Sequence, residues 1–398
     1  MRILYISFNM PWRGGGTFYR VFGFAKHLVE RGHEVTVMAT SPDSKFSFQE
    51  EVWDGVKIVL SPALLSGKLR TGWDFYEVLR RCLWLNGRSF DIVHGFESRP
   101  VVIYPALYAN RQNGSALLLD WCDWFGRGGS VEERGRITRF FLRPVETFYE
   151  ERFRNKAQGT TVINSVLQSR AISLGVQPES IHWLPNGAET QNVRVIPIDE
   201  ARQALNLPQD AILLGHLGQA FPNDAVLMAE AFQLIQQELP QAKLVLIGHH
   251  KTDIATLFSA PTAVLETGYV TQEEMNLYLA ACDLLWLPLK NTLANRGRWP
   301  MKINDYMSSG RAVVSTNVGD LVSLFDGPRP IGVLSDDTPV QFAKKTVDML
   351  QNDEQRKLYG ENGRFLVENE FAWEKVTEDL ETFYKKVHAF HLEQQRLP

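Results

Sequence analysis

Short apolar runs alternate with segments of helical periodicity along almost the whole chain, and this alternation restricts the fold more than any other feature. Residues 2–8 form the first run, apolar residues between Phe18 and Val29 recur three or four positions apart, and residues 34–39 form the next run. A strand, a helix and a second strand in this order make a βαβ unit, whose strands lie parallel in one sheet. The pattern predicts an α/β fold with parallel sheets.

Two series of such units follow each other, separated by a polar, proline-containing stretch at residues 190–209. Candidate strands of the first series lie at residues 91–94, 116–121, 159–164 and 181–184, and those of the second at 211–217, 243–248, 263–265, 283–289, 312–316 and 331–334. Two α/β domains of similar size are therefore expected. An amphipathic pattern from Phe371 to Val387 predicts a final helix with no strand after it, which is free to pack elsewhere.

Composition and charge exclude several classes of protein. The 398 residues are 44% hydrophobic and 22% charged, an ordinary globular mixture that can fill two cores. Lys and Arg number 42 against 46 Asp and Glu, so the basic surface of a dedicated nucleic-acid-binding protein is missing. Three cysteines, Cys82, Cys122 and Cys282, lie far apart, which argues against a disulfide framework or a zinc site. No apolar run reaches the ~18 residues that span a bilayer, and we expect a soluble, cytoplasmic protein.

Seven short motifs, taken in order, connect the chain with a known family. They are RGHEVTV at residues 31–37, DIVH at 91–94, VINS at 162–165, LPNG at 184–187, VLIG at 245–248, GYV at 268–270 and PMKINDYMSSGR at 300–311. Each motif is common by itself, and their order and spacing carry the resemblance. Together with a Gly-rich turn after the first strand, they resemble the GT-B glycosyltransferases, in particular the large retaining family 4.

The resemblance implies two Rossmann-like domains that face each other across a cleft. Residues 1–190 would form the N-terminal domain on the acceptor side, joined by the final helix at 372–398, and residues 191–371 would form the C-terminal domain on the donor side. It also implies a retaining, metal-independent transfer of a sugar from a nucleotide-diphosphate sugar, with no separate cofactor, to a carbohydrate or lipid-linked acceptor in cell-envelope or glycoconjugate synthesis. Two alternatives stay open: a sugar-nucleotide epimerase of the same fold and a non-catalytic binding subunit.

A glycine-rich turn is the first candidate for binding the pyrophosphate of such a donor, which needs fixed cations or N–H donors. Gly14, Gly15 and Gly16 lie between the first strand and the first helix. Without Cβ atoms, their backbone N–H groups can approach a phosphate at the positive end of the helix. The alternative is a plain flexible turn.

A basic cluster is the second candidate for binding phosphate. Four cations lie within 16 residues whose only acid is Asp305: Arg296, Arg298, Lys302 and Arg311. Pro300 suits the first turn of a helix, so Lys302 would lie near the positive end of the helix dipole, where a cation suggests an anionic ligand. We expect the first three cations to bind phosphate and Lys302 and Arg298 also to assist catalysis, whereas Arg311 is expected to be a helix-end cation. The alternative is a solvated basic face.

Some positions depart from the family's pattern. Members usually carry an Arg and a Lys after the first strand of the second domain, where this chain has His216 and no Lys. Two Glu that members often have, with seven residues between them, are replaced by Gly297 and Asp305. By resemblance, Asp305 would bind the ribose hydroxyls, and Gly268 and Tyr269 would belong to the donor site.

In the first domain, Asp123 is the strongest polar candidate. It follows the run at residues 116–121, after which many members place a His that contacts the donor sugar. A carboxylate there could bind sugar hydroxyls or accept the acceptor's proton. The alternative is that Asp120 or Asp123 caps the Gly-rich turn at residues 126–129. His94, at the end of another strand, is expected to be structural, and Cys122 is assigned no chemistry.

Residues 127–156 combine charge with apolar side chains. The segment holds eight basic residues and five acids. Five apolar residues are available for one helix face: Ile137, Phe140, Phe141, Val145 and Phe148. We expect the segment to contact an anionic membrane or a lipid-linked acceptor, which would place the protein on the inner face of the membrane. A helix packed against the interior, with a solvated charged side, is the alternative.

Overall fold

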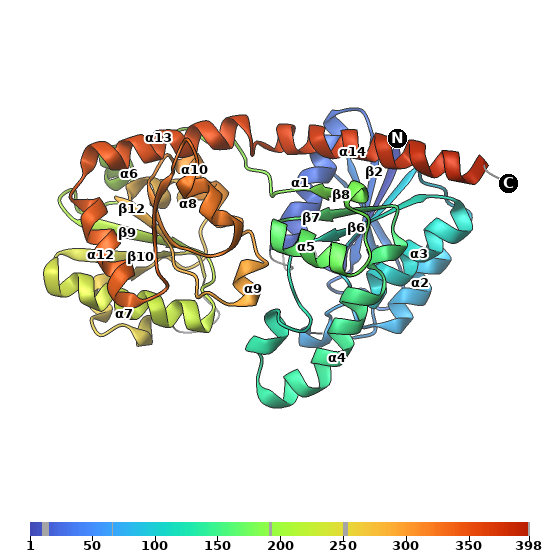
Figure 1. Ribbon diagram of the computed structural model, residues 1–398, viewed down its shortest axis with the longest axis horizontal. Coiled ribbons are helices and arrows are strands. Elements are labelled where there is room, and N and C mark those ends of the chain that lie inside the picture. Colours follow the sequence, from blue (N-terminus) through green and yellow to red (C-terminus); the bar gives the residue numbers. More distant parts are fainter. Residues whose placement is uncertain (10–15, 66, 191–192, 250–253, 397–398) are drawn as a thin grey trace. The chain divides into compact units, whose positions relative to one another are not determined.

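The computed structural model describes residues 1–9, 16–65, 67–190, 193–249 and 254–396, and it divides the chain into two compact units (Figure 1). The first unit consists of Met1–Gly187 and Trp373–Pro398, and the second of Ala188–Ala372. Each unit contains a predominantly parallel sheet flanked by helices. The α/β fold class expected from the alternation of strands and helices is confirmed.

The sheet of the first unit has eight strands in the order β3-β4-β2-β1-β5-β6-β7-β8. The strands are β1 Arg2–Ile6, β2 Glu34–Thr40, β3 Gln49–Trp53, β4 Val56–Ser61, β5 Ile92–Phe96, β6 Ala116–Trp121, β7 Gly159–Val162 and β8 Ile181–Trp183. The main helices are α1 Gly16–Glu30, α2 Phe75–Leu85, α3 Pro100–Asn113, α4 Arg136–Arg152, α5 Ser165–Ser173 and α14 Trp373–Arg396. All strand pairs are parallel except β3 with β4.

Strands β3 and β4 were not expected from the sequence. They form an antiparallel hairpin that extends the edge of the sheet, with β4 paired to β2. The turn contains Asp54 (φ 47°) and Gly55 (φ 79°), the positive φ angles that a two-residue hairpin turn requires. β3 reads QEEVW and is mostly exposed, so it carries no apolar run that would mark a strand.

Side chains alternate between the two faces of the sheet in the first unit. In β1, Ile3 and Tyr5 belong to a core that includes α1 and α14, whereas Leu4 and Ile6 belong to a core on the other face that includes α3. α14 contributes six side chains to the first of these cores: Trp373, Val376, Leu380, Phe383, Tyr384 and Val387. The final helix is therefore an integral part of the first unit.

Trp373 is enclosed between two glycines of the first unit. A Cβ atom at Gly23 in α1 would lie 2.4 Å from the Trp373 ring, and one at Gly187 would lie 2.2 Å from it. The ring also meets Phe24 edge to face, with centroids 5.1 Å apart. Both glycines are needed because the indole occupies the space of their missing side chains.

The second unit contains a six-stranded parallel sheet in the order β11-β10-β9-β12-β13-β14. Its strands are β9 Ile212–Leu217, β10 Ala242–Ile247, β11 Val264–Glu266, β12 Leu284–Leu287, β13 Val313–Thr316 and β14 Gly332–Ser335. Its helices are α6 Ile198–Ala204, α7 Pro222–Glu238, α8 Gln272–Ala281, α9 Leu293–Arg296, α10 Lys302–Ser309, α11 Ser323–Asp326, α12 Pro339–Leu350 and α13 Asp353–Asn369. Trp286 is the largest side chain of its core, and its ring contacts those of Phe232 and Phe342.

In the described ranges, none of the helices combines the length and the apolar character needed to cross a membrane. All three cysteines are free thiols.

Candidate active site

Each sheet has a position where the strand order reverses, and in open parallel sheets ligands bind beyond the carboxyl ends of the strands at such a position. In the second unit, β9 lies between β10 and β12; in the first, β1 lies between β2 and β5. Polar side chains gather at the carboxyl ends of strands in both units.

Lys302, the first residue of α10, lies at the carboxyl end of β9. Its Nζ is 3.2 Å from His216 Nε2 and donates to the carbonyl oxygen of Gln219 at 3.1 Å. His216 Nδ1 lies 3.1 Å from the carbonyl oxygen of Trp286, which can only accept. The proton of the imidazole is therefore on Nδ1, and Nε2 accepts from the ammonium.

Two ionisable groups of this cluster have pKa values displaced toward neutrality. Burial lowers the pKa of Lys302 to about 8, although the nearby carboxylates of Asp224 and Asp305 oppose the change. Burial raises the pKa of Asp305 to about 7, with Lys302 opposing it. Water therefore solvates the ammonium of Lys302 poorly, and a bound anion would stabilise its charged form.

Arg298 and Arg296 lie on the loop and short helix before α10. Arg298 donates to Asn295 Oδ1 at 2.5 Å, and its guanidinium lies over the ring of Phe221 at 4.0 Å. Asn295 in turn donates to Asp224 Oδ1 at 3.2 Å. Arg298 and Lys302 are therefore both linked to Asp224, in the first turn of α7.

Arg296 and Arg311 have partners other than those of Lys302 and Arg298. Arg296 donates to Asn291 Oδ1 at 2.6 Å. Arg311 is buried and donates to the carbonyl oxygens of Ala280 and Ile196 at 2.7 and 2.6 Å. It directly follows Gly310, which ends α10 in the left-handed conformation (φ 68°). The prediction that Arg311 is a helix-end cation is confirmed.

Gly268 and Tyr269 follow β11. Gly268 has a φ of 68° and forms an isolated bridge with Gly248, the residue after β10. Tyr269 is 86% exposed, and its ring stacks on that of His249 with centroids 4.6 Å apart. An exposed aromatic face therefore lies near the carboxyl ends of β10 and β11.

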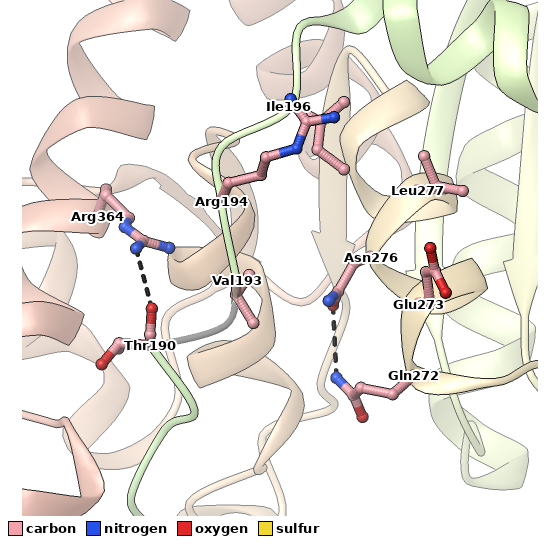
Figure 2. Close-up of a pocket in the computed structure, with 9 residues that line it drawn as sticks. All are labelled: Thr190, Val193, Arg194, Ile196, Gln272, Glu273, Asn276, Leu277 and Arg364. Atoms are coloured by element: carbon pink, nitrogen blue, oxygen red, sulfur yellow. Dashed lines mark hydrogen bonds between the residues drawn. The ribbon is translucent and has the colours of Figure 1, made fainter.

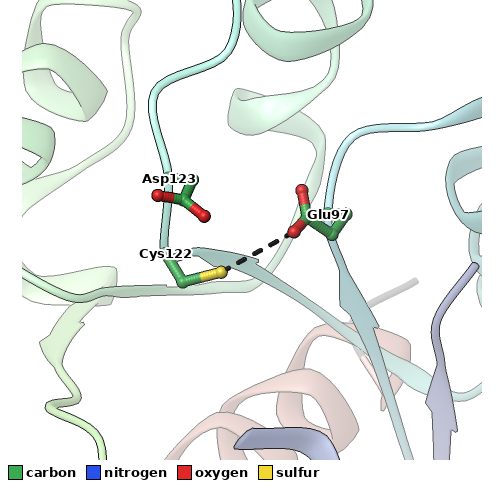
Figure 3. A group of neighbouring side chains, drawn as sticks. All are labelled: Glu97, Cys122 and Asp123. Atoms are coloured by element: carbon green, nitrogen blue, oxygen red, sulfur yellow. Dashed lines mark hydrogen bonds between the residues drawn. The ribbon is translucent and has the colours of Figure 1, made fainter. Parts of the chain in front are cut away.

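In the first unit, Glu97, Cys122 and Asp123 follow the adjacent strands β5 and β6 (Figure 3). Each residue offers one atom of a kind that ligates metal ions, a carboxylate oxygen or the thiol sulfur, and these three atoms lie within 4.8 Å of one another. Cys122 Sγ is 3.9 Å from Glu97 Oε1, which also accepts from the hydroxyl of Thr17 at 2.9 Å. Burial, strengthened by the charge of Asp123, raises the pKa of Glu97 to about 8, so this carboxyl is protonated near neutral pH.

The predicted glycine turn is only partly within the described residues. Gly14 and Gly15 lie outside them. Gly16 is the exposed first residue of α1, next to Thr17. The contact between Thr17 and Glu97 brings the start of α1 to the Glu97 cluster.

Asp120 and His94 are structural. The Asp120 carboxylate pairs with buried Arg20 at 2.9 Å. The Gly-rich turn that Asp120 or Asp123 was proposed to cap is held instead by Glu150, which accepts from the backbone N–H groups of Phe125 and Gly126 at 2.8 and 2.9 Å. His94 places its two ring nitrogens 2.6 Å from the Tyr384 hydroxyl and 3.1 Å from that of Thr161, as expected for a structural histidine.

A separate pocket of about 690 Å³ lies in the second unit between α8, α13 and the residues before α6 (Figure 2). It is lined by Thr190, Val193, Arg194, Ile196, Gln272, Glu273, Asn276, Leu277 and Arg364. Arg364 donates to the carbonyl oxygen of Thr190 at 3.3 Å, and Gln272 to Asn276 at 3.4 Å. None of the residues proposed for the site from the sequence lines this pocket.

Family models match both units. A model described as "Glycosyl transferases group 1" matches residues 210–352, and one described as "Glycosyl transferase 4-like domain" matches residues 15–187. The second unit belongs to the group 1 glycosyl transferases and the first to the glycosyl transferase 4-like domains. The resemblance that the seven motifs carry is therefore confirmed.

Two bacterial relatives of this glycosyl transferase belong to cell-envelope synthesis by name. The lipopolysaccharide 1,2-N-acetylglucosaminetransferase of Salmonella typhimurium (strain LT2) is 22% identical over 254 residues, 60% of this chain and 58% of the relative. TuaH of Bacillus subtilis (strain 168), named for teichuronic acid biosynthesis, is 23% identical over 269 residues, 66% of this chain and 62% of the relative. The matched stretch spans about three fifths of each relative's length.

Solved structures share the fold of this glycosyl transferase. Sucrose-phosphate synthase from Thermosynechococcus elongatus superposes with a TM-score of 0.79 at 17% identity, covering 98% of this chain and 99% of the other. The Anabaena protein HepE in complex with UDP and glucose superposes with a TM-score of 0.70 at 16% identity, covering 97% and 100%. The GT-B fold expected from the sequence is confirmed.

Sequence reasoning missed two residues of this glycosyl transferase's candidate site. Glu97 was overlooked because the strand before it was expected to end at His94, whereas β5 continues to Phe96. Asp224 was overlooked because it lies in the first turn of a helix, where an acid is ordinary. A signal existed for Glu97, since it is the first residue after a buried strand.

Proposed function

We propose that the protein is a retaining, metal-independent glycosyltransferase that moves a sugar from a nucleoside-diphosphate sugar to an acceptor of cell-envelope polysaccharide or glycoconjugate synthesis. The observation that carries the proposal is the Lys302 cluster at the carboxyl end of β9, where a partly desolvated ammonium meets a neutral imidazole. The names of the two bacterial relatives support the class of pathway.

On the donor side, Lys302 and Arg298 bind the pyrophosphate and stabilise the charge that grows on it as the sugar departs. Arg296 adds a second guanidinium on the same loop. Asp305 accepts hydrogen bonds from the ribose hydroxyls, and Gly268 and Tyr269 contact the nucleoside. The diphosphate charge favours protonated Lys302, so binding reverses the lowering of the pKa of Lys302.

In the first unit, Asp123 binds a sugar hydroxyl, and the backbone N–H of Gly16 at the start of α1 binds a phosphate. Protonated Glu97 donates a hydrogen bond to the acceptor or the transferred sugar, because its pKa of about 8 keeps it neutral beside Asp123. Retention follows if the leaving phosphate oxygen accepts the acceptor's proton on the face from which the sugar departs. In that route neither carboxylate acts as a nucleophile.

The test is a thermal-shift titration with nucleoside diphosphates in the presence of EDTA, beginning with UDP because HepE was solved with it. A ligand that binds only the folded state at 100 times its Kd adds about 2.7 kcal/mol to the free energy of unfolding. Stabilisation that needs magnesium or manganese would contradict metal independence. Turnover of the UDP-sugar then separates an enzyme from a binding subunit, and the product separates transfer from epimerisation.

Contact with an anionic membrane through residues 127–156 is part of the proposed function. The exposed side chains of α4, which include Phe140, Phe141 and Phe148, support this contact. Arginines flank these rings, so the helix offers both apolar area and positive charge to a lipid surface. Flotation with anionic vesicles and not with neutral ones is the expected result, and equal flotation with both contradicts it.

A further inference from the structure

The surface at the start of α4 contains a pocket of about 330 Å³ that no residue of the donor or acceptor clusters lines. Its lining residues are Arg127, Arg136, Arg139, Phe140, Arg143 and Pro144. We call this the arginine pocket. Four guanidinium groups around one hollow are unusual, because like charges repel each other unless an anion or a carboxylate lies between them.

Among the residues that the structure describes, one acid, Glu132, contacts this set. Glu132 Oε1 is 2.7 Å from Arg143 Nε, and Arg139 donates to the backbone carbonyl of Glu132 at 3.2 Å. Within the described ranges, the side chains of Arg127 and Arg136 have no hydrogen-bonding or ion-pair partner. The pocket therefore keeps a clear excess of positive charge.

The position of the arginines along the helix points the same way. Arg136 is the first residue of α4 and Arg139 is the fourth, and the first turn contains no acidic residue. Cations in a first turn oppose the helix dipole, whose positive end lies there. One anion bound there would interact favourably with both the helix dipole and the guanidinium groups.

Exposed apolar side chains accompany the arginines on α4. Phe140, which lines it, is 76% exposed, and its neighbours Ile137 and Phe141 are 78% and 66% exposed. Phe140 and Phe141 meet edge to face with ring centroids 5.3 Å apart. An inorganic anion would leave these side chains in water, whereas an anion attached to an acyl or prenyl chain would cover them.

We propose that the arginine pocket binds the phosphate or diphosphate group of an amphiphile, with its hydrocarbon part against Ile137, Phe140 and Phe141. Planar guanidinium groups match phosphate oxygens with paired hydrogen bonds, which favours phosphate over a single carboxylate. The assignment deepens the membrane contact of the proposed function and rests on that function only for the origin of the amphiphile, as a headgroup or a lipid-linked acceptor.

The test compares two soluble probes by isothermal titration calorimetry: dihexanoyl phosphatidic acid below its micelle concentration, and inorganic pyrophosphate. The expected Kd for the lipid is at least tenfold lower than that for pyrophosphate. The double variant Arg136→Gln, Arg139→Gln should raise the lipid Kd tenfold or more. Phe140→Ala should raise the lipid Kd and leave the pyrophosphate Kd unchanged.

The matched control is the double variant Arg88→Gln, Arg111→Gln. It removes the same charge from two exposed arginines that lie outside residues 127–156, one after α2 and one in the last turn of α3. Its lipid Kd should stay within twofold of that of the wild type. Equal lipid binding by the two double variants, or pyrophosphate binding as tight as that of the lipid, would overturn the assignment.

The nucleoside-diphosphate thermal shift is measured on the same proteins. The pocket variants should keep the wild-type shift, because their side chains belong to α4 and not to the Lys302 cluster. If the wild type shows no such shift, the proposed function fails while the result for the arginine pocket stands. If the shift is present and the lipid binds all variants equally, only the arginine pocket fails.

Discussion

Lys302 illustrates how a single residue acquires its chemistry from its surroundings. The sequence indicated that Lys302 would bind an anion because it is a cation near the start of a helix. The structure adds a neutral His216 and a carbonyl oxygen as its partners, which satisfy its hydrogen bonds but do not neutralise its charge. This combination suits a group that must hold a diphosphate and release it after transfer.

Replacing Lys302 tests its role in catalysis. Lys302→Ala should lower kcat/KM by roughly 100-fold or more, because a contact with the leaving group strengthens in the transition state. Asp305→Ala should mainly raise the KM for the donor, since a ribose contact is similar in the ground and transition states. Donor kinetics on both variants, with thermal melts to show that they fold, make the measurement. Wild-type kinetics for Lys302→Ala would place the phosphate elsewhere.

The pKa of Lys302 makes donor binding depend on pH. In the free protein Lys302 loses its proton near pH 8, whereas a bound diphosphate moves its pKa back toward 10.5. The complex therefore holds more protons than the free protein above pH 8. The Kd for the nucleoside diphosphate should rise by up to tenfold per pH unit there. Calorimetry at pH 9 in buffers of different ionisation enthalpy should show proton uptake, and Lys302→Arg should abolish it.

Glu97 should make stability fall with rising pH. Its pKa is about 8 in the folded protein and about 4.5 when unfolded, so the folded state binds more protons between these values. The free energy of unfolding should decrease by up to about 1.4 kcal/mol per pH unit across this window. Chemical denaturation at pH 5, 6.5 and 8 should show a smaller decrease for Glu97→Gln than for the wild type. A parallel decrease in both proteins would exclude Glu97 as the cause.

The amino-acid sequence predicted many residues of the candidate site, but not all of them. The basic cluster before α10 and Asp123 were indicated by charge density and by position after a strand. The contact of Lys302 with His216 was not, because the two residues are 86 positions apart and belong to different elements. Likewise Glu97 and Cys122 come together only because β5 pairs with β6. Their proposed roles stay predictions.

At the scale of the elements, buried parallel strands were the most predictable part of the fold. β1, β6 and β10 carry continuous apolar runs, which mark strands covered on both faces. The hairpin of β3 and β4 was missed because β3 is polar and lies at the edge of the sheet. Apolar periodicity indicates which residues are buried, so it cannot reveal a strand whose side chains are mostly exposed.

The packing of α13 against α10 depends on a glycine. A Cβ atom at Gly360 would lie 2.1 Å from the carbonyl oxygen of Gly310, whereas one at Gly363 would have its nearest neighbour at 3.4 Å. Gly360→Ala should lower the free energy of unfolding by about 1–3 kcal/mol through overpacking. Gly363→Ala, on the same helix, should raise it by up to about 1 kcal/mol. Denaturant titrations of both variants make the comparison, and equal stabilities would contradict it.

At the scale of the whole molecule, the chain returns to its first unit after completing the second. Ending the chain at Ala372 would remove six buried side chains from the first unit, on the order of 10 kcal/mol at about 1.5–3 kcal/mol each. That loss is comparable to the total stability of a domain. The first unit should then lose its cooperative transition in calorimetry while that of residues 188–372 persists. Ending the chain at Leu392, beyond the core residues of α14, is the control and should leave both transitions.

The return of α14 also has a consequence during translation. Residues 188–372 are one continuous stretch, so the second unit can complete its fold on the ribosome as soon as that stretch has emerged. The first unit is made earlier yet must wait until α14 has been made, because Phe24 and the hydroxyl of Tyr5 contact Trp373 and Tyr384 in that helix. Until then the apolar side chains that α14 covers in the first unit are exposed to solvent and to chaperones. The half of the protein that is synthesised first is therefore the half that finishes folding last.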